Sequence, residues 1–319
     1  MKNKDIQTAA RIINNGGLVA FPTETVYGLG ADALNPISVA KIFVLKERPS
    51  FDPLIVHIAS IDDLKIVTNQ PTDLVLRLAE KFWPGPLTIV LPKSSIIPDI
   101  VTSGLRTVGI RMPDNEIALN LIRTSKCPIA APSANKFGHL SPVSANHVKK
   151  QLPDVDFILD GGRTEIGIES TILSIDGNIC TLLRPGKITI ADINDALPGL
   201  FVFNINKSER FIAPGFLKSH YSPKKPLYLY KTHQTQLPEK SGMILHGLTD
   251  KIPVSEKVIY TSQNNNLLEI AANLFSSLHA MEDDDQVKQI FIEPVIEEGL
   301  GVAIMDRIKK AAFKYKSIK

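Results

Sequence analysis

Short apolar runs alternate with segments of helical periodicity along most of this chain, and this alternation restricts the fold more than any other feature. The first helix is expected over residues 5–15, where apolar side chains recur every three or four positions before two glycines end the segment. A strand is expected next, at 18–21, and Asn35 followed by Pro36 then predicts the start of another helix. Strands intermixed with helices predict a mixed α/β fold.

The same patterns continue to the end of the chain, with one interruption. In the first part we expect further strands at 54–58, 87–91, 108–112, 129–131, 157–159, 172–175 and 179–183, and helices at 37–47, 61–68, 72–82, 116–125 and 190–196. After the interruption we expect strands at 227–230, 242–245, 258–260 and 290–294, and helices at 267–281 and 302–313. The predicted domains are therefore 1–204 and 227–319, joined by a polar linker at 205–226.

Composition and charge exclude several classes of protein. With 319 residues, 44% hydrophobic and 22% charged, the chain is long enough for two folded domains. The net charge of +3 suits an anionic ligand but is too small for a dedicated nucleic-acid binder. Because no apolar run has the length of a secretory signal or a membrane span, we expect a cytoplasmic protein without membrane contact.

Cysteine and histidine usage argues against a metal site belonging to the protein itself. Cys127 and Cys180 lie far apart in apolar runs, which favours two buried thiols. The seven histidines show no paired ligand spacing, so any metal is expected to arrive with a substrate.

Two glycine motifs imitate phosphate loops and are rejected. The sequence GLGADA at 28–33 fits the dinucleotide fingerprint, but residues 22–27 separate it from the strand and the helix starts only at Pro36. The sequence GRTEIGIE at 162–169 carries Ile168 where a P-loop needs lysine. Since GxSxG is also absent, covalent hydrolase chemistry has no support.

Four apolar runs end in hydroxyl, amide or guanidinium side chains next to glycine or proline. These ends supply Thr23, Thr25 and Tyr27; Ser133, Asn135 and Ser141; Ser170 and Thr171; and Arg184. A single such end is most simply a turn stabilised by local hydrogen bonds, but four of them favour a ligand site. The glycines at 28 and 30 are expected to let the chain leave that site.

Cations accompany these strand ends. Lys46 and Arg48 follow a helix, where they could simply cap it, and Arg106 and Arg184 lie beside other predicted strands. Arg111 stands within an apolar strand, where burial without a partner is costly, so it faces either solvent or an anion. His57 also stands in an apolar strand, and both a core histidine and a ligand contact are open for it.

Together these residues describe an enzyme that holds a polyphosphate and positions a second substrate against it. Reactions at phosphorus depend on alignment and charge stabilisation more than on covalent chemistry by the protein. The residues alone lead no further than this class.

A family resemblance extends the interpretation. The motifs FPTETVYGLGADA, KERPSFDPLIVHIA, FWPGPLTIVL, GIRMPDN, APSANKFGHLSP, IESTILSI and LLRPG stand in this order within residues 16–199, followed by APGFLKSHYSP and EEGLGVAIMDRIKKAA. In these motifs the chain resembles the L-threonylcarbamoyladenylate synthase family in its long, two-domain form. The resemblance implies a YrdC-like twisted mixed sheet with flanking helices, followed by a smaller Rossmann-like β/α domain.

The resemblance also implies an activity. Such an enzyme, a nucleotidyltransferase, would join L-threonine, bicarbonate or carbon dioxide, and ATP into threonylcarbamoyl-AMP and release pyrophosphate, with Mg²⁺ accompanying the ATP. The product would go to a separate tRNA threonylcarbamoyl transferase complex.

Site residues follow by position in the matching motifs. The L-threonine site would contain Thr25, His57, Arg111 and Thr171. The ATP site would contain Lys46, Arg48, Asp52, Thr107, Ser133, Asn135, Ser141, Arg184 and Tyr221, with Lys46 and Arg48 as the catalytic cations. Tyr221 resembles a residue that covers the nucleotide, which would make the HYSP segment a lid.

The chain departs from the family pattern at four places in these motifs: the segment GFLKSHYSP lacks the usual GMKYRHYAP sequence, and three single residues differ. Asp52 replaces the usual Asn, Glu47 replaces the usual Gly, and Phe137 replaces a Ser. A carboxylate near phosphates would repel them unless it meets magnesium or a cation.

Two alternatives differ in class. One is carbamoyl transfer of the hydrogenase-maturation type, which carries additional modules ahead of this domain. The other is an RNA-binding module, which would bind with steep salt dependence and without regard to threonine. Even within the synthase interpretation, a weak RNA contact remains open.

Overall fold

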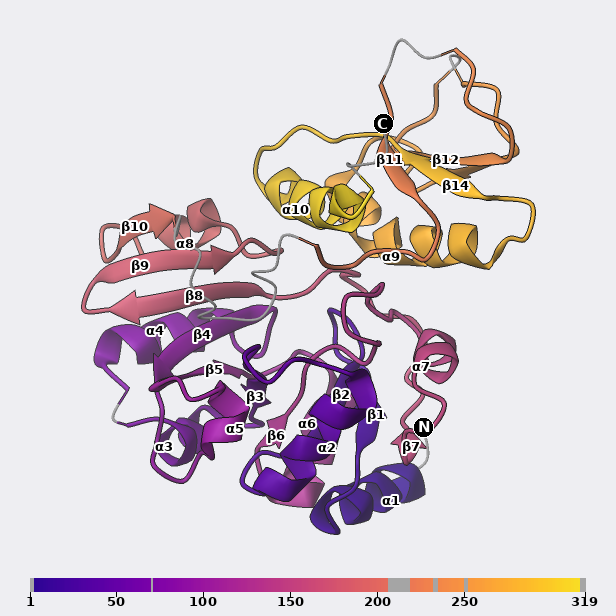
Figure 1. Ribbon diagram of the computed structural model, residues 1–319. Coiled ribbons are helices and arrows are strands. Elements are labelled where there is room, and N and C mark those ends of the chain that lie inside the picture. Colours follow the sequence, from indigo (N-terminus) through magenta and orange to yellow (C-terminus); the bar gives the residue numbers. More distant parts are fainter. Residues whose placement is uncertain (1–2, 70, 206–218, 232–234, 250–251, 316–319) are drawn as a thin grey trace. The chain divides into compact units, whose positions relative to one another are not determined.

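The computed structural model describes residues 3–69, 71–205, 219–231, 235–249 and 252–315 (Figure 1). They form two compact units. The first unit comprises Met1–Phe137, Pro142–Thr164 and Glu169–Phe216, and the second comprises Gly138–Ser141, Glu165–Ile168 and Leu217–Lys319. Most of the predicted linker, residues 206–218, lies outside the described residues, and the predicted domain bounds stay a prediction.

The first unit is the mixed α/β domain expected from the sequence. Its strands are β1 (Val19–Phe21), β2 (Gly28–Asp32), β3 (Ile55–His57), β4 (Leu87–Pro92), β5 (Thr107–Arg111), β6 (Ile129–Ala130), β7 (Phe157–Ile158), β8 (Thr171–Asp176), β9 (Ile179–Arg184) and β10 (Val202–Ile205). Its helices are α1 (Asn3–Asn14), α2 (Pro36–Lys46), the 3₁₀ turn η1 (Ile61–Asp63), α3 (Leu64–Val67), α4 (Asp73–Phe82), α5 (Asp99–Thr102), α6 (Glu116–Ser125), α7 (Ala145–Gln151) and α8 (Ile190–Ala196).

These strands join one sheet with parallel and antiparallel neighbours. The order among the described strands is β10-β9-β8-β4-β5-β3-β6-β2-β1-β7 (Figure 1). Alternate residues of a strand face opposite sides, so Val19, Phe21 and Ile129 pack with α1 and α6, whereas Ala20 and Val56 belong to the larger core on the other side. The first side continues along β3, β5, β4 and β8, where the sequence places polar residues.

The second unit is a small parallel β/α domain. Its strands are β11 (Leu227–Leu229), β12 (Ser241–Leu245), β13 (Lys257–Tyr260) and β14 (Gln289–Ile292), in the order β11-β14-β12-β13. Its helices are α9 (Leu267–Asp283) and α10 (Leu300–Phe313). Every strand pair in this sheet is parallel, as expected for the Rossmann-like domain.

The sequence patterns missed some elements of the first unit. The strands β2 and β10 and the short helices α5 and α7 were not expected, and the helix expected at 61–68 is a 3₁₀ turn followed by α3. The expectation for Gly28 and Gly30 was wrong, because both lie inside β2. A Cβ at residue 30 would lie 2.7 Å from Ile129 Cγ2 and 2.8 Å from the Phe21 ring, so glycine is needed for close packing.

Two short segments that precede the predicted linker, Gly138–Ser141 and Glu165–Ile168, belong to the second unit. One of them contains Gly167, with φ +74°, where a Cβ would lie 2.5 Å from the carbonyl oxygen of Ala271 in α9. In the other, the Ser141 carbonyl oxygen lies 3.1 Å from His279 Nε2. Residues distant in sequence therefore build this unit.

Candidate active site

Strand alternation gathers polar side chains on one face of the first unit's sheet. His57 in β3 is the register partner of Arg111 in β5, so both project to the same side. On this side β4 contributes Thr88 and Val90, and β8 contributes Ile172; Val90 and Ile172 form a small buried cluster with Ile55. The face thus combines a charged group, hydroxyls and an apolar floor.

Arg111 is buried at 4% exposure and is held from three directions. Its Nη1 donates to Thr25 Oγ1 at 2.9 Å, its Nε donates to the Gly85 carbonyl oxygen at 3.4 Å, and its Nη2 lies 2.6 Å from Glu24 Oε1. Of the sequence's two alternatives for Arg111, solvent is excluded by this burial. Thr25 is held in turn by Thr23, whose hydroxyl lies 2.8 Å from that of Thr25.

His57 is also buried, with its ring edge against Phe21 at a centroid distance of 5.9 Å. Burial, and after it the nearby charge of Arg111, lowers the pKa of His57 to about 3. The imidazole is therefore neutral across the physiological pH range.

A second group of charges surrounds Asp52. Arg48 pairs with Asp52 through Nη2 and Oδ2 at 3.0 Å and donates to the carbonyl oxygens of Asp52 and Pro53. Burial raises the pKa of Asp52, although Arg48, Lys46 and Arg184 act against the rise. The replacement of Asn by Asp thus adds a carboxylate that a cation already neutralises.

Lys46 is the last residue of α2 and is almost fully buried. Its ammonium group donates to the Ser133 carbonyl oxygen at 2.6 Å and to the carbonyl oxygen of Asn135. Burial lowers the pKa of Lys46 well below its ordinary value, Arg48 lowers it further, and Asp52 opposes this. Because backbone carbonyl groups hold the Lys46 ammonium group inside the protein, Lys46 is not merely a solvent-exposed cap of the helix, which was one alternative from the sequence.

The hydroxyl group of Ser170 connects Arg184 to Thr88, which lies on the same face of the sheet as Arg111. Arg184 donates from Nε and Nη2 to the carbonyl and hydroxyl oxygens of Ser170, each at 3.0 Å. The Ser170 hydroxyl lies 2.8 Å from that of Thr88, and the Thr171 hydroxyl donates to the Ile188 carbonyl oxygen at 2.6 Å. Register pairing of Ile172 with Arg184 fixes this arrangement.

The remaining predicted residues are only partly brought together. Ser133 and Asn135 meet Lys46 through their backbones, as described, while Thr107 lies at the opposite end of β5 from Arg111. Ser141 and Tyr221 belong to the second unit. Tyr221 packs there against Phe275, with ring centroids 5.6 Å apart, and the Arg307 guanidinium lies 5.6 Å from its ring centre.

Sequence reasoning missed Glu24 and Thr88 as members of this face. Thr88 is the second residue of β4 and the one hydroxyl side chain in an otherwise apolar strand, which was the available signal. Glu24 stands between two threonines that were named, so its position in the polar strand end was the available signal.

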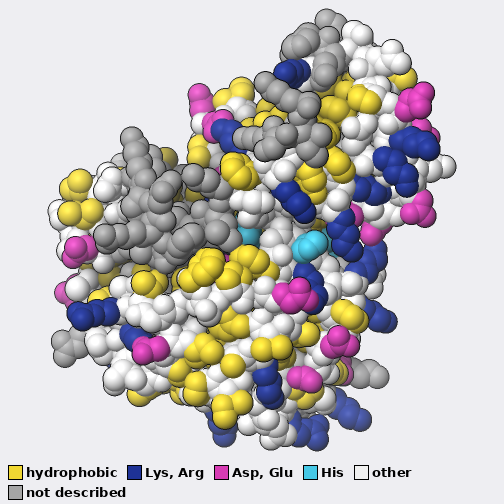
Figure 2. Space-filling view, in the orientation of Figure 1, with side chains coloured by type: hydrophobic (Ala, Val, Ile, Leu, Met, Phe, Trp, Pro, Cys, Tyr) yellow, Lys and Arg dark blue, Asp and Glu magenta, His cyan; other side chains and the backbone are white. Residues whose placement is uncertain are grey.

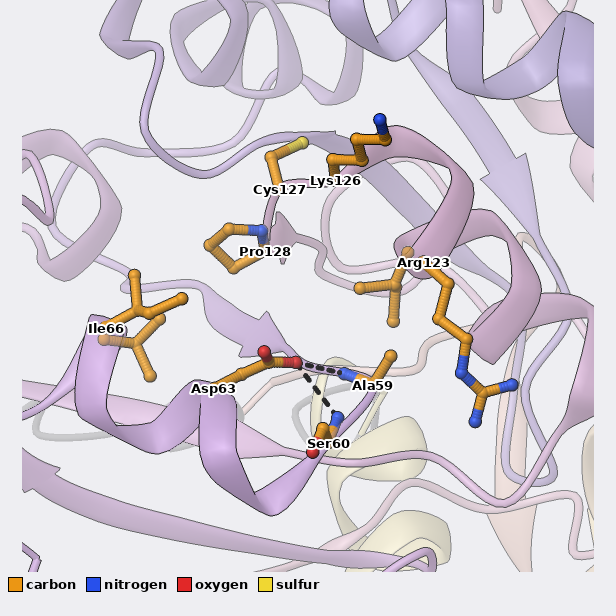
Figure 3. A pocket seen from close by; sticks show the side chains of 10 residues that line it. Ala59, Ser60, Asp63, Ile66, Arg123, Lys126, Cys127 and Pro128 are labelled. Carbon is orange, nitrogen blue, oxygen red and sulfur yellow. Dashed lines mark hydrogen bonds between the residues drawn. The ribbon is translucent and has the colours of Figure 1, made fainter.

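A cavity of about 280 Å³ lies elsewhere in the first unit (Figure 3). It is lined partly by Asp63, Arg123, Lys126 and Cys127, none of them a predicted site residue. Asp63 Oδ2 accepts from the backbone N–H groups of Ala59 and Ser60, which caps the turn η1. Its carboxylate therefore serves the local fold.

Basic side chains are interspersed with acidic ones over the described residues of the first unit in Figure 2. Within the described part of the chain, no group of three or more His, Cys, Asp or Glu side chains is placed to hold a metal ion. None of the helices described is both long and apolar enough to cross a membrane.

The mixed sheet and its buried cations and hydroxyls define an α/β domain with side chains suited to anionic groups. The family model for Sua5/YciO/YrdC, described as "Telomere recombination", matches residues 11–186. The model for the "Threonylcarbamoyl-AMP synthase, C-terminal domain" matches residues 188–313.

Full-length relatives give the particular family. The threonylcarbamoyl-AMP synthase of Pyrococcus abyssi is 40% identical, covering 96% of this chain and 94% of the relative, and that of Bacillus subtilis is 41% identical, covering 96% and 92%. The crystal structure of P. abyssi Sua5 complexed with L-threonine matches with a TM-score of 0.88 at 38% identity, covering 98% of this chain and 95% of that one. The chain belongs to the threonylcarbamoyl-AMP synthase family, in its two-domain form.

Proposed function

We propose that this chain condenses L-threonine, bicarbonate or carbon dioxide, and ATP into threonylcarbamoyl-AMP, acting as a nucleotidyltransferase that releases pyrophosphate. The observation that carries the proposal is the pair of buried cationic groups in the first unit. One is centred on Arg111 and the other on Asp52 with Lys46, Arg48 and Arg184. Two substrates that must meet, one carrying a carboxylate and the other a triphosphate, need two such groups.

L-threonine is proposed to occupy the group around Arg111. The guanidinium would receive the amino-acid carboxylate, because a planar guanidinium matches a carboxylate in charge and shape. Thr25, Thr171 and neutral His57 would supply hydrogen bonds, and His57 can both donate and accept because it carries no charge at neutral pH. The P. abyssi relative solved with L-threonine supports this choice of ligand.

ATP is proposed to occupy the second group. Lys46, Arg48 and Arg184 would balance the phosphate charges, and Asp52, Thr107, Ser133, Asn135, Ser141 and Tyr221 complete the proposed set. Phosphate oxygens would favour the protonated form of Lys46, which burial disfavours. Mg²⁺ would enter as part of the substrate, because it keeps several waters and binds mainly through the phosphates.

The chemistry requires little covalent participation by the protein. The neutral amine of threonine adds to carbon dioxide, forming a carbamate and releasing a proton. A carbamate oxygen then forms a bond to the α-phosphorus as the bond to the pyrophosphate oxygen breaks. Lys46 and Arg48 would stabilise the charge that develops on the phosphates, and the fixed positions of both substrates would supply the alignment.

The product's destination is also part of the proposal. A mixed anhydride of a carbamate and AMP is an activated group donor, so a separate tRNA threonylcarbamoyl transferase would consume it. We place both proteins in the cytoplasm, where ATP and tRNA are available.

Pyrophosphate release measured with one substrate omitted at a time tests the proposal. We expect release only when L-threonine, bicarbonate and ATP with Mg²⁺ are all present, together with a product of the mass of threonylcarbamoyl-AMP. Release that continues without threonine contradicts the assignment. If RNA binds instead, with steep salt dependence and no effect of threonine, the binding-module alternative gains support.

A further inference from the structure

Glu24 is the least explained charged group of the candidate site. Its side chain is 4% exposed, and its one ion-pair contact is the 2.6 Å approach of Oε1 to Arg111 Nη2. Among the described residues neither carboxylate oxygen accepts a well-aligned hydrogen bond. An ionised carboxylate offers about four acceptor positions, and buried polar groups normally have partners.

Stability does not account for this pair. Desolvating two charges costs about as much as their attraction returns, and replacing a buried ion pair by apolar residues is often neutral or stabilising. The lack of further hydrogen bonds to the carboxylate oxygens makes the free energy of burying this pair less favourable. A ligand that donates hydrogen bonds to Glu24 would supply the missing partners of its carboxylate.

The charges restrict what that ligand can be. Arg111 has five N–H donors: Nε donates to Gly85 and Nη1 donates once to Thr25, whereas Nη2, although 2.6 Å from Glu24 Oε1, makes no well-aligned hydrogen bond, so both terminal nitrogens retain donors for a ligand. A plain carboxylate that bound there would also face the negative charge of Glu24. A zwitterion meets both partners with opposite charge and leaves the net charge of the site unchanged.

We propose that Glu24 binds the ammonium group of the amino-acid substrate while Arg111 binds its carboxylate, so that the pair selects zwitterionic α-amino acids. Thr25, which follows Glu24 and receives the Arg111 hydrogen bond, fixes the spacing of the pair. The inference rests on the proposed function and adds a residue that selects the substrate.

Calorimetric binding without ATP tests the proposal, using two ligands that differ only in the ammonium group. L-threonine carries it, whereas 3-hydroxybutyrate has the same carboxylate and hydroxyl without it. The variant Glu24→Gln keeps the shape of the side chain and removes the charge. The matched control is Glu80→Gln on the exposed face of α4.

The wild-type protein is expected to bind threonine more tightly than 3-hydroxybutyrate. In Glu24→Gln the threonine affinity should fall about tenfold or more, because a hydrogen bond to a charged group is lost, while the affinity for 3-hydroxybutyrate stays or rises. Glu24→Asp should keep part of the preference, and Glu80→Gln all of it.

Two results overturn the inference. One is unchanged threonine affinity in Glu24→Gln; the other is an equal loss for both ligands, which would make Glu24 only a support for Arg111. Thermal unfolding of each variant checks folding, and if Glu24→Gln unfolds, the same comparison in Glu24→Asp decides. Failure of the proposed function looks different, since the wild-type protein would then show no threonine-dependent pyrophosphate release.

Discussion

Buried charges at the candidate site are paired with each other, and this pairing has consequences for single residues. Arg111 faces Glu24, and Arg48 faces Asp52, each pair with exposures below a tenth. Removing one partner of such a pair leaves an uncompensated charge in a poorly solvated place. The loss of a ligand contact and the loss of stability therefore have to be separated experimentally.

Arg111→Ala is expected to raise the threonine concentration needed for half-maximal pyrophosphate release by at least tenfold. It should also lower the free energy of unfolding by about 3–5 kcal/mol, because Glu24 loses its partner. Urea unfolding measures the second effect, and adding Glu24→Gln should recover part of the stability without recovering threonine binding. An Arg111→Ala enzyme with the wild-type threonine dependence contradicts the assignment, and exposed Arg77→Ala is the control.

Two buried histidines predict loss of stability in acid. Burial lowers the pKa of His57 to about 3 and that of His246 to about 4, whereas an unfolded histidine titrates near 6.5. Between these values the unfolded chain binds more protons than the native one, so the free energy of unfolding falls as pH decreases below about 6.5. Urea unfolding at pH 7.5 and pH 5 measures the difference, which should be smaller in His246→Gln; an undiminished difference refutes the role of His246.

At the scale of elements, α2 shows how a helix delivers a functional side chain. Asn35 caps its N-terminus by accepting from the backbone N–H groups of Ile37 and Ser38, and the helix ends at Lys46. The next residue, Glu47, is the C-cap and adopts a left-handed conformation with φ 55°. This geometry gives a physical reason for the glycine usual at this position in the family.

Glu47→Gly is accordingly expected to raise the free energy of unfolding by up to about 1 kcal/mol, since glycine adopts the left-handed region without a steric penalty. The ion pair that it removes, with Lys136, is solvent-accessible and contributes little. Chemical denaturation measures the change. Glu80→Gly, inside a helix, should lower stability by about 1 kcal/mol, and equal effects at both positions would refute the explanation.

At the scale of the whole molecule, the chain carries two units with separate sheets. Its single tryptophan, Trp83, and both cysteines lie in the first unit, so these side chains report on that unit alone. Trp83 is buried and donates from Nε1 to the Leu87 carbonyl oxygen at 2.7 Å.

Native thiol labelling is expected to be very slow. Burial raises the pKa of Cys127 and of Cys180 to about 12, which leaves about one thiolate in ten thousand at pH 8, against about a quarter for an ordinary cysteine. With increasing urea, labelling should rise together with the change in Trp83 fluorescence. A thiol that reacts within seconds in the native protein contradicts this expectation.

Much of this architecture was predictable because period and composition are local properties. The order of strands and helices around β3, β5 and β8 and the cationic character of the site follow from them, whereas the Rossmann-like form of the second unit was implied by the family resemblance. The strand β2 was missed because its glycines resemble a loop in sequence, and only their contacts with Phe21 and Ile129 show why a strand needs them.

The sequence by itself determined the α/β class, the family and the types of side chain at the site, because apolar period, turn residues and motif order are properties of the chain alone. Only the tertiary structure decided which charges meet. Glu24 and Arg111 are far apart in sequence, and their pairing arises because the loop after β1 and the strand β5 converge on one sheet face. Burial lowers the pKa of both His57 and Lys46. It likewise exists only once the sheet has formed, since desolvation depends on the atoms packed around a group.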